Sequence, residues 1–170
     1  MPANEIVDLL PGQFFVHRNI ANVVVHTDLN CQIVTQFAVD VSKVKHILLV
    51  GHYGCSGVRA ALRYERVVLA DNWLRHVHDV REKHHRCIDR LPDGAAQSAR
   101  LFEFNVIEQV DNVCNTSILR DAWARGQDVT VHGLIYSLHD GVLRDLQCSA
   151  SSVAEAARSY AAAMQLLAHA

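Results

Sequence analysis

The sequence has no excess of basic residues, which removes one class of function at the outset. Its 16 lysines and arginines are balanced by 18 aspartates and glutamates, giving a formal net charge of −2, and they are scattered along the chain. A protein that binds nucleic acid through its phosphates needs basic residues gathered on one face or in one segment. We therefore expect no nucleic-acid partner.

Long hydrophobic runs are also missing. No stretch approaches the roughly 20 apolar residues that cross a bilayer, and the first residues lack the basic start and unbroken apolar segment of a signal peptide. Cysteine is sparse, with five residues in the chain. Because they are odd in number and widely spaced, they do not suit a disulfide framework. We expect a protein of the reducing cytoplasm with no membrane partner.

What remains is the composition of an ordinary globular domain, with 50% hydrophobic and 20% charged residues in 170. Helical and strand patterns alternate without a linker, repeat or low-complexity tract. The pattern predicts one α/β domain over residues 1–170, with a mostly parallel central sheet flanked by helices. Pro11 and Gly12 are predicted to end the first helix, and Asp28 is predicted to cap the second. Strands are predicted at residues 13–17, 44–50, 128–138 and 142–147, and helices at residues 4–10, 28–41, 57–63, 72–84, 99–115, 118–125 and 152–167.

The segment at residues 51–57 follows a buried apolar strand and reads Gly-His-Tyr-Gly-Cys-Ser-Gly. In open parallel sheets, ligands usually bind at the carboxyl ends of the strands. A nucleophile elbow needs Gly two residues before and two after the nucleophile, and neither Cys55 nor Ser56 has both. A phosphate loop needs Lys and then Ser or Thr after its last Gly, and these are absent. Zinc ligation by His52 and Cys55 fits best, although a structural turn with an incidental buried thiol is equally compatible with the spacing.

Other potential metal ligands are interpreted as packing residues. Cys31 lies within a predicted helix, where a small buried thiol is expected, and Cys87, Cys114 and Cys148 are interpreted in the same way. Residues 84–87, which read His-His-Arg-Cys, follow a charged helix. We interpret them as a solvated helix end.

Three separated motifs occur along the chain: Phe-Val-His-Arg-Asn-Ile-Ala-Asn at residues 15–22, Gly-His-Tyr-Gly-Cys at residues 51–55 and His-Gly-Leu-Ile-Tyr at residues 132–136. With these motifs the chain strongly resembles the β-class carbonic anhydrases, and among them the bacterial branch. The resemblance implies a zinc enzyme that interconverts carbon dioxide and bicarbonate. It also implies a mostly parallel sheet, assembly as a homodimer or tetramer, and a catalytic zinc held in part by His52 and Cys55.

One motif of that family is absent. By the resemblance, the third zinc ligand belongs to a Cys-x-Asp-x-Arg motif, whose Asp and Arg orient and gate the fourth position of the metal. No such motif occurs in the 170 residues. In the family the motif is followed by Val-Pro-Ala, and this chain opens with Met1, Pro2 and Ala3. We hypothesise that a GUG valine codon inside a longer gene was taken as its start.

The expected consequence is a weak zinc site. Catalytic zinc normally has three protein ligands and one open position, and it lowers the pKa of its bound water to about 7. With His52 and Cys55 alone, the 170-residue chain is expected to be inactive or nearly so. The alternative is a non-catalytic truncated paralogue that acts as an interaction or regulatory subunit. Zinc content and hydratase activity distinguish the two.

Four further positions carry expectations from the resemblance. Ser56 stands where the family usually has Gly. Three outcomes are open for this small side chain: it is tolerated, it narrows the substrate pocket, or it adds a hydroxyl near the metal. Gly57 keeps the backbone flexible one residue later. Arg18 and Tyr136 match residues that hold a regulatory bicarbonate in the bacterial branch, and their side chains suit an oxyanion. The Trp that completes that pocket in the family has no counterpart in this sequence. The alternative is that Arg18 pairs with a carboxylate and Tyr136 packs in the core.

Overall fold

The structure, a computed structural model, describes residues 3–10 and 12–169. Met1 and Pro2, compared above with the family's Val-Pro, and Pro11, predicted to end the first helix, lie outside the described residues. In chain order the elements are α1 (Ala3–Val7), the 3₁₀ turn η1 (Ile20–Asn22), α2 (Leu29–Gln36), the π-helical turn η2 (Phe37–Val41), β1 (His46–His52), α3 (Ser56–Leu62), α4 (Ala70–Lys83), α5 (His85–Ile88), α6 (Gly94–Cys114), α7 (Ser117–Ala124), β2 (Thr130–Tyr136), β3 (Leu143–Asp145) and α8 (Val153–His169).

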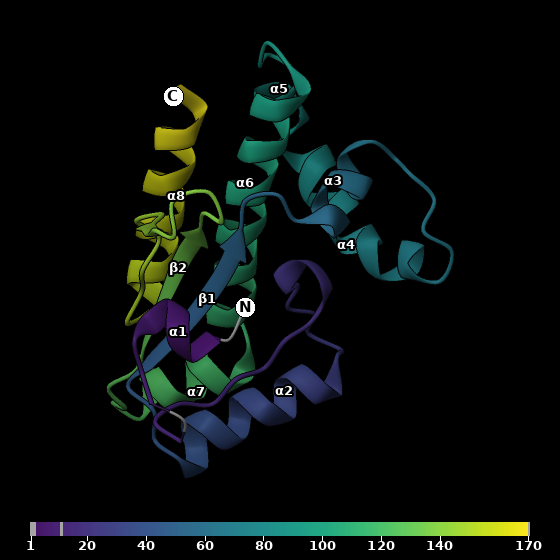
Figure 1. Cartoon of the computed structure of the whole chain (residues 1–170). Coiled ribbons are helices and arrows are strands. Elements are labelled where there is room, and N and C mark those ends of the chain that lie inside the picture. The colour runs from purple at the N-terminus through teal and green to yellow at the C-terminus, as the bar shows by residue number, and fades with distance from the viewer. Residues whose placement is uncertain (1–2, 11, 170) are drawn as a thin grey trace.

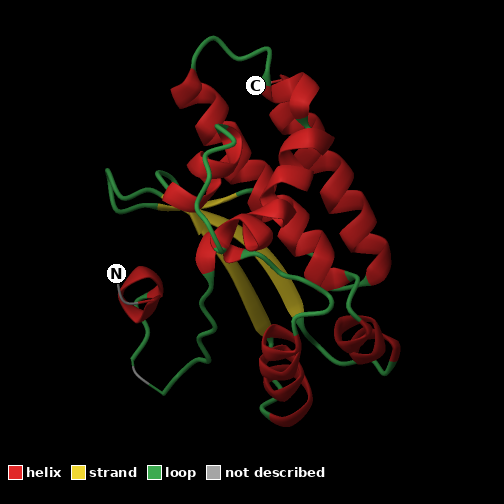
Figure 2. Cartoon of the chain, turned by 90° about the vertical axis from the view of Figure 1, so that its right-hand side faces the viewer, coloured by secondary structure: helices red, strands yellow, loops and turns green. Residues whose placement is uncertain are grey.

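A small, mostly parallel sheet forms the centre of the fold, as the sequence predicts. Strands β1 and β2 run parallel, from the pairing of His46 with Thr130 to that of His52 with Tyr136, and the short β3 is antiparallel to β2. Helix α6 lies against one face of the sheet with α8 beside it, and α1 lies on the opposite side (Figures 1 and 2). Because β1 and β2 are parallel, their carboxyl ends bring His52 and Tyr136 side by side.

Two glycines let α6 approach the sheet closely. A Cβ added at Gly51 would lie 2.4 Å from Cγ2 of Val106, and one at Gly133 would lie 2.9 Å from Cγ2 of Val110. Since successive side chains of a strand point to opposite faces, the even-numbered residues of β1 point away from α6. Leu48 is one of them and remains 43% exposed. The face of the sheet opposite α6 is therefore only partly covered.

Most predicted helices are confirmed, with shifts at their ends. The predicted helix at residues 28–41 forms as α2 and η2, and Asp28 Oδ1 accepts a hydrogen bond from Asn30 N at 3.1 Å. Helix α6 begins at Gly94 instead of residue 99, because Asp93 Oδ1 accepts from the backbone N–H groups of Ala95 and Ala96. Along the described ranges, no helix combines the length and the apolar character needed to cross a membrane.

The prediction of a strand at residues 13–17 is wrong. The sheet formed by the described residues contains only β1, β2 and β3, so this segment has no neighbouring strand to pair with. Phe15 and Val16 are 54% and 48% exposed, and the Phe15 ring lies 5.7 Å from that of Phe37 on η2. A strand needs a partner for its backbone groups, and apolar residues along a segment do not supply one.

Backbone strain marks the long connection between α3 and α4. Val68 has φ +51° and is 83% exposed, so a β-branched residue occupies the left-handed region without compensating burial. This conformation costs an L-residue roughly 1–2 kcal/mol. Glycine at this position would avoid that cost, but its greater chain entropy in the unfolded state would cancel part of the gain. Val68→Gly is expected to raise the free energy of unfolding by about 1 kcal/mol in urea denaturation. Val67→Gly, at a neighbour without positive φ, is the control and should not stabilise; equal effects of the two substitutions would contradict the strain.

Candidate metal centre

The His-x-x-Cys pair lies where β1 ends and α3 begins, as predicted. His52 is the last residue of β1, and Tyr53 N still donates to Tyr136 O at 2.9 Å, which fixes the first turn residue to β2. Gly54 has φ +80° and reverses the chain, so that Cys55 becomes the N-cap of α3. The turn brings the two side chains together.

The side chains of His52 and Cys55 are close enough for each to shift the pKa of the other. Nδ1 of His52 also contacts Tyr53 O at 3.1 Å, and since a carbonyl only accepts, Nδ1 carries the proton. Nε2 is then the ring nitrogen that would bind a metal, in place of any proton that it shares with Cys55. A metal-binding histidine commonly donates its other N–H to a backbone carbonyl in this way.

The pair also has the electrostatics of a metal site. Burial raises the pKa of the Cys55 thiol, but hydrogen bonds from His52 and from the backbone N–H groups of Val58 and Gly57 outweigh this effect, so that the pKa lies below its ordinary value. The hydrogen bond to Cys55 is the largest cause of the raised pKa of His52. A thiolate is the form of cysteine that binds zinc, so the donor set fits this metal.

No third candidate ligand joins His52 and Cys55 among the residues that the structure describes. Within residues 3–10 and 12–169, no group of three or more His, Cys, Asp or Glu side chains is placed to hold a metal ion. Cys31 is buried on α2, and Cys114 and Cys148 are buried next to each other, where burial raises the pKa of each thiol to about 12. These three thiols pack in the core, as predicted, and Cys87 is half-buried on α5.

Ser56 and Gly57 differ in their surroundings. Ser56 is exposed as the first residue of α3. A Cβ on Gly57 would lie 3.0 Å from Cγ2 of Ile20 and 3.4 Å from Cδ2 of Leu74. Gly57 therefore allows α3 to pack closely against η1 and α4, and this packing role adds to the backbone flexibility predicted for it.

Arg18 and Tyr136 lie at the same end of the sheet as His52. Tyr136 is the register partner of His52 and is buried, with 9% of its surface exposed. Arg18 is exposed, and its charge is close enough to lower the pKa of His52 slightly. The structure thus brings both residues toward the candidate metal centre.

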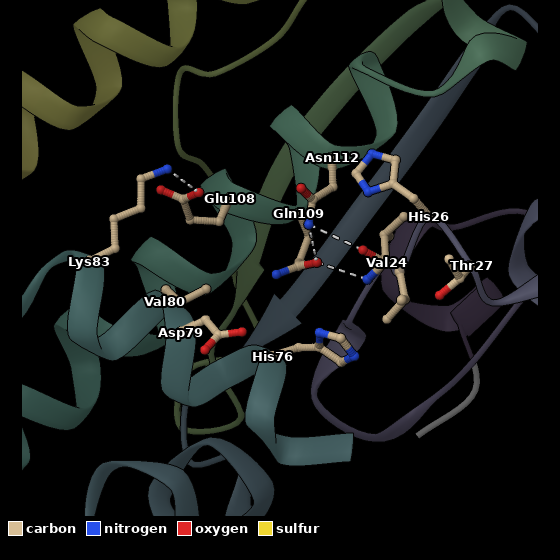
Figure 3. Close-up of a pocket in the computed structure, with 11 residues that line it drawn as sticks. Val24, His26, Thr27, His76, Asp79, Val80, Lys83, Glu108, Gln109 and Asn112 are labelled. Atoms are coloured by element: carbon tan, nitrogen blue, oxygen red, sulfur yellow. Dashed lines mark hydrogen bonds and ion pairs between the residues drawn. The ribbon is translucent and has the colours of Figure 1, made fainter. Parts of the chain in front are cut away.

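A separate cavity of about 370 Å³ lies between α4, α6 and the segment after η1 (Figure 3). Hydrogen bonds close its walls: Gln109 Oε1 accepts from Val24 N at 2.8 Å, and Asn112 Nδ2 donates to Val24 O at 3.1 Å. None of the predicted site residues lines this cavity. Its lining consists of Val24, Val25, His26, Thr27, His76, Asp79, Val80, Lys83, Glu108, Gln109 and Asn112.

Glu108, at the edge of this cavity, is a buried carboxylate that the sequence did not reveal. It accepts from Lys83 Nζ at 2.8 Å, from His84 Nε2 at 2.6 Å and from Tyr160 OH at 2.6 Å. Burial raises the pKa of Glu108, but these hydrogen bonds and charges outweigh burial and lower it to about 2. The His84 ring also stacks on Phe104 at 4.2 Å, so the interpretation of residues 84–87 as a solvated helix end is wrong for His84.

Comparison with known proteins gives consistent matches. A family model described as carbonic anhydrase matches residues 1–143. A carbonic anhydrase of Emericella nidulans is 42% identical over 146 residues, which cover 86% of this chain and 64% of that protein. A carbonic anhydrase of Candida albicans is 35% identical over 144 residues, covering 81% and 50%. The chain thus spans between half and two thirds of the length of these relatives.

Solved structures give the same result. The Coccomyxa β-carbonic anhydrase in complex with acetazolamide superposes with a TM-score of 0.88 at 33% identity, covering 93% of this chain and 72% of that one. A tetrameric β-carbonic anhydrase of Sordaria macrospora superposes with a TM-score of 0.82 at 36% identity, covering 88% and 76%. These relatives are fungal and algal, so the bacterial branch is not confirmed.

Proposed function

Because the chain belongs to the β-class carbonic anhydrase family, we propose that it is, or is part of, a zinc enzyme that interconverts carbon dioxide and bicarbonate, with His52 and Cys55 as two of the zinc ligands. The observation that carries the proposal is the placement of His52 and Cys55 beside each other, where β1 ends and α3 begins. Zinc held there would supply a bound water with its pKa lowered to about 7. Residues 1–170 would form one family domain around this centre.

The residues of this chain would prepare the site in two ways. The Tyr53 carbonyl holds the proton of His52 on Nδ1 and keeps Nε2 available. The backbone N–H groups of Val58 and Gly57 stabilise the Cys55 thiolate. Exposed Ser56 stands beside this thiolate, and with Gly57 it would border the space for carbon dioxide.

The incomplete set of zinc ligands bears on the catalytic activity of the chain. Among the described residues two ligands meet, and no third completes a metal-binding group, while the family's Cys-x-Asp-x-Arg motif is absent from the 170 residues. Zinc with fewer protein ligands should be held weakly, and without the Asp–Arg pair substrate should be poorly oriented. We propose that a polypeptide of these 170 residues alone is inactive or nearly so.

A second function is a non-catalytic interaction or regulatory subunit that retains the fold. The incomplete ligand set favours it. Zinc content and the initial rate of carbon dioxide hydration by the purified 170-residue chain, after dialysis against zinc, distinguish the functions. The expected result is substoichiometric zinc and a rate below about one hundredth of that of a relative with three ligands. Stoichiometric zinc with full activity would contradict the need for the absent motif.

Arg18 and Tyr136 are proposed to hold bicarbonate as a regulatory ligand. Support comes from their placement at the same end of the sheet as His52 and from the suitability of a guanidinium and a phenol for an oxyanion. Bicarbonate bound here would lie close enough to influence the candidate metal centre.

We propose that the chain assembles as a homodimer or tetramer through an apolar stripe on α2 and η2. Its four side chains recur at every fourth residue and are between 48% and 71% exposed, and we name this surface the α2 stripe: Leu29, Ile33, Phe37 and Val41. Phe15 packs against Phe37 and extends the apolar surface. The single charged residue in this helical segment is Asp40, so two copies can meet without repulsion between like charges.

Phe37→Asp is expected to break this assembly. A carboxylate in the centre of an apolar contact must lose its hydration without a partner, so the dissociation constant should rise at least about tenfold. Light scattering during gel filtration would then report a monomer at concentrations where the parent chain is a dimer or tetramer. Leu166→Asp on α8, at a position 54% exposed, is the matched control. An unchanged mass for Phe37→Asp would place the interface elsewhere.

A further inference from the structure

Two histidines meet on the partly covered face of the sheet, at the end of β1 opposite to the candidate metal centre. His46 Nδ1 lies 3.1 Å from His132 Nε2. His46 begins β1 and pairs with Thr130, two residues before His132 on β2, so both side chains point to the face away from α6. His46 is exposed and His132 is half-buried. Solvent and ions therefore reach the pair.

His132 is oriented from behind by a third side chain. Its Nδ1 lies 3.0 Å from Ser149 Oγ, in the segment that joins β3 to α8. When Nδ1–H donates to this hydroxyl, Nε2 keeps its lone pair toward His46. A partner on the second ring nitrogen is the usual way in which proteins fix the tautomer and direction of a metal-binding histidine.

We propose that His46 and His132 form a binding site for a late first-row divalent transition-metal ion, such as Ni²⁺, Cu²⁺ or Zn²⁺. Imidazole is a preferred ligand of these ions. Two nitrogens 3.1 Å apart, each at about 2.05 Å from one ion, subtend an angle of roughly 98°, between the square-planar and tetrahedral values. The ring planes are inclined by 39°, and exposed His46 can turn to direct its lone pair at the shared ion.

The proposed site has two protein ligands, with water in its remaining positions. The negative charge of Asp145 acts on His132 and would favour a bound cation. Because no third His, Cys, Asp or Glu side chain among the described residues completes the group, binding should be reversible and weaker than at a site with three protein ligands. A bound ion would join β1 to β2 and so stabilise the sheet.

This site is separate from the candidate metal centre. His46 and His52 are the first and last residues of β1, which places them roughly 20 Å apart along an extended strand. Its occupancy therefore neither requires nor completes the His52–Cys55 pair. If metal does not bind at His52 and Cys55, the proposal for His46 and His132 still stands, and the reverse also holds.

The test is a Ni²⁺ titration of the whole chain carrying Cys55→Ser, which removes the thiolate of the other site. Imidazole ¹H–¹⁵N NMR follows each histidine, and thermal unfolding follows stability. The expected first resonances to broaden are those of His46 and His132, with a Tm that rises as Ni²⁺ is added. His46→Asn should weaken Ni²⁺ binding at least about tenfold, and Ser149→Ala should weaken it by about tenfold through loss of the orienting partner.

The matched control is His139→Asn, which removes an exposed histidine from a turn outside the pair. Exposure of His46 keeps its substitution compatible with folding, and His132→Asn provides the second ligand test. If His46→Asn and His139→Asn bind Ni²⁺ equally well, the proposal is overturned and the pair is only a hydrogen bond between two rings. The same conclusion follows if other histidines broaden first.

Discussion

Cys55→Ser is expected to lower the zinc affinity of the chain by at least about a hundredfold while leaving the fold intact. The substitution replaces a thiolate with a hydroxyl that stays protonated at neutral pH and is a poor zinc ligand. Loss of an outer partner of a metal ligand already costs 10–100-fold in affinity, and loss of the ligand itself should cost more. Competition with a chromophoric zinc chelator measures the change, and circular dichroism checks the fold.

Cys31→Ser is the matched control for this experiment. Cys31 is as buried as Cys55, at 6% against 8% exposure, but it lies on α2, and its hydrogen-bonding neighbour is Thr35. Its substitution should change stability slightly and zinc affinity not at all. Equal losses of zinc affinity in the two variants would show that the effect comes from disturbed packing and not from a lost ligand.

Gly133→Ala is expected to destabilise the fold by about 3 kcal/mol, near the upper end of the usual cost of overpacking. The added Cβ would lie 2.2 Å from Sγ of Cys148 and 2.9 Å from Cγ2 of Val110. Gly133 lies in β2, which is paired with β1 on one side and β3 on the other, and Val110 lies on α6. Neither β2 nor α6 can therefore move apart to make room for the methyl group without shifting a neighbouring element. Urea denaturation should show a lower midpoint with an unchanged slope.

Two further variants make this prediction specific. Gly94→Ala adds a methyl group where nothing lies within 4 Å, and as a substitution within a helix it should not destabilise. Cys148→Ala added to Gly133→Ala removes the closer contact and should restore part of the lost stability, since residues in contact couple. A midpoint for Gly133→Ala equal to that of the parent chain would mean that α6 does not pack this closely.

The placement of His52 and Cys55 beside each other was predictable because its signals are local. The apolar run at residues 47–49 indicates a buried strand, and the glycines that follow indicate a turn, so the sequence alone places His52 and Cys55 together at a strand end. The Asp28 cap has a similarly local signal and is confirmed by its hydrogen bond to Asn30.

Features that depend on distant contacts were not predictable. Residues 13–17 have a strand-like composition but no strand to pair with. Glu108 is one acidic residue in a long helix, and its buried position follows from three partners on α4, α8 and the residue after α4. Gly57 has the sequence signature of a flexible turn, yet its neighbours Ile20 and Leu74 show a packing role that appears only when the chain is folded.

The zinc K-edge X-ray absorption spectrum of the zinc-loaded chain would show whether His52 and Cys55 bind zinc together. It is best recorded with His46→Asn, so that zinc at the second proposed site does not contribute. We expect one sulfur at about 2.3 Å and at least one imidazole nitrogen at about 2.0 Å, with oxygen in the remaining positions. A first shell of nitrogen and oxygen alone, or sulfur scattering that survives Cys55→Ser, would contradict it.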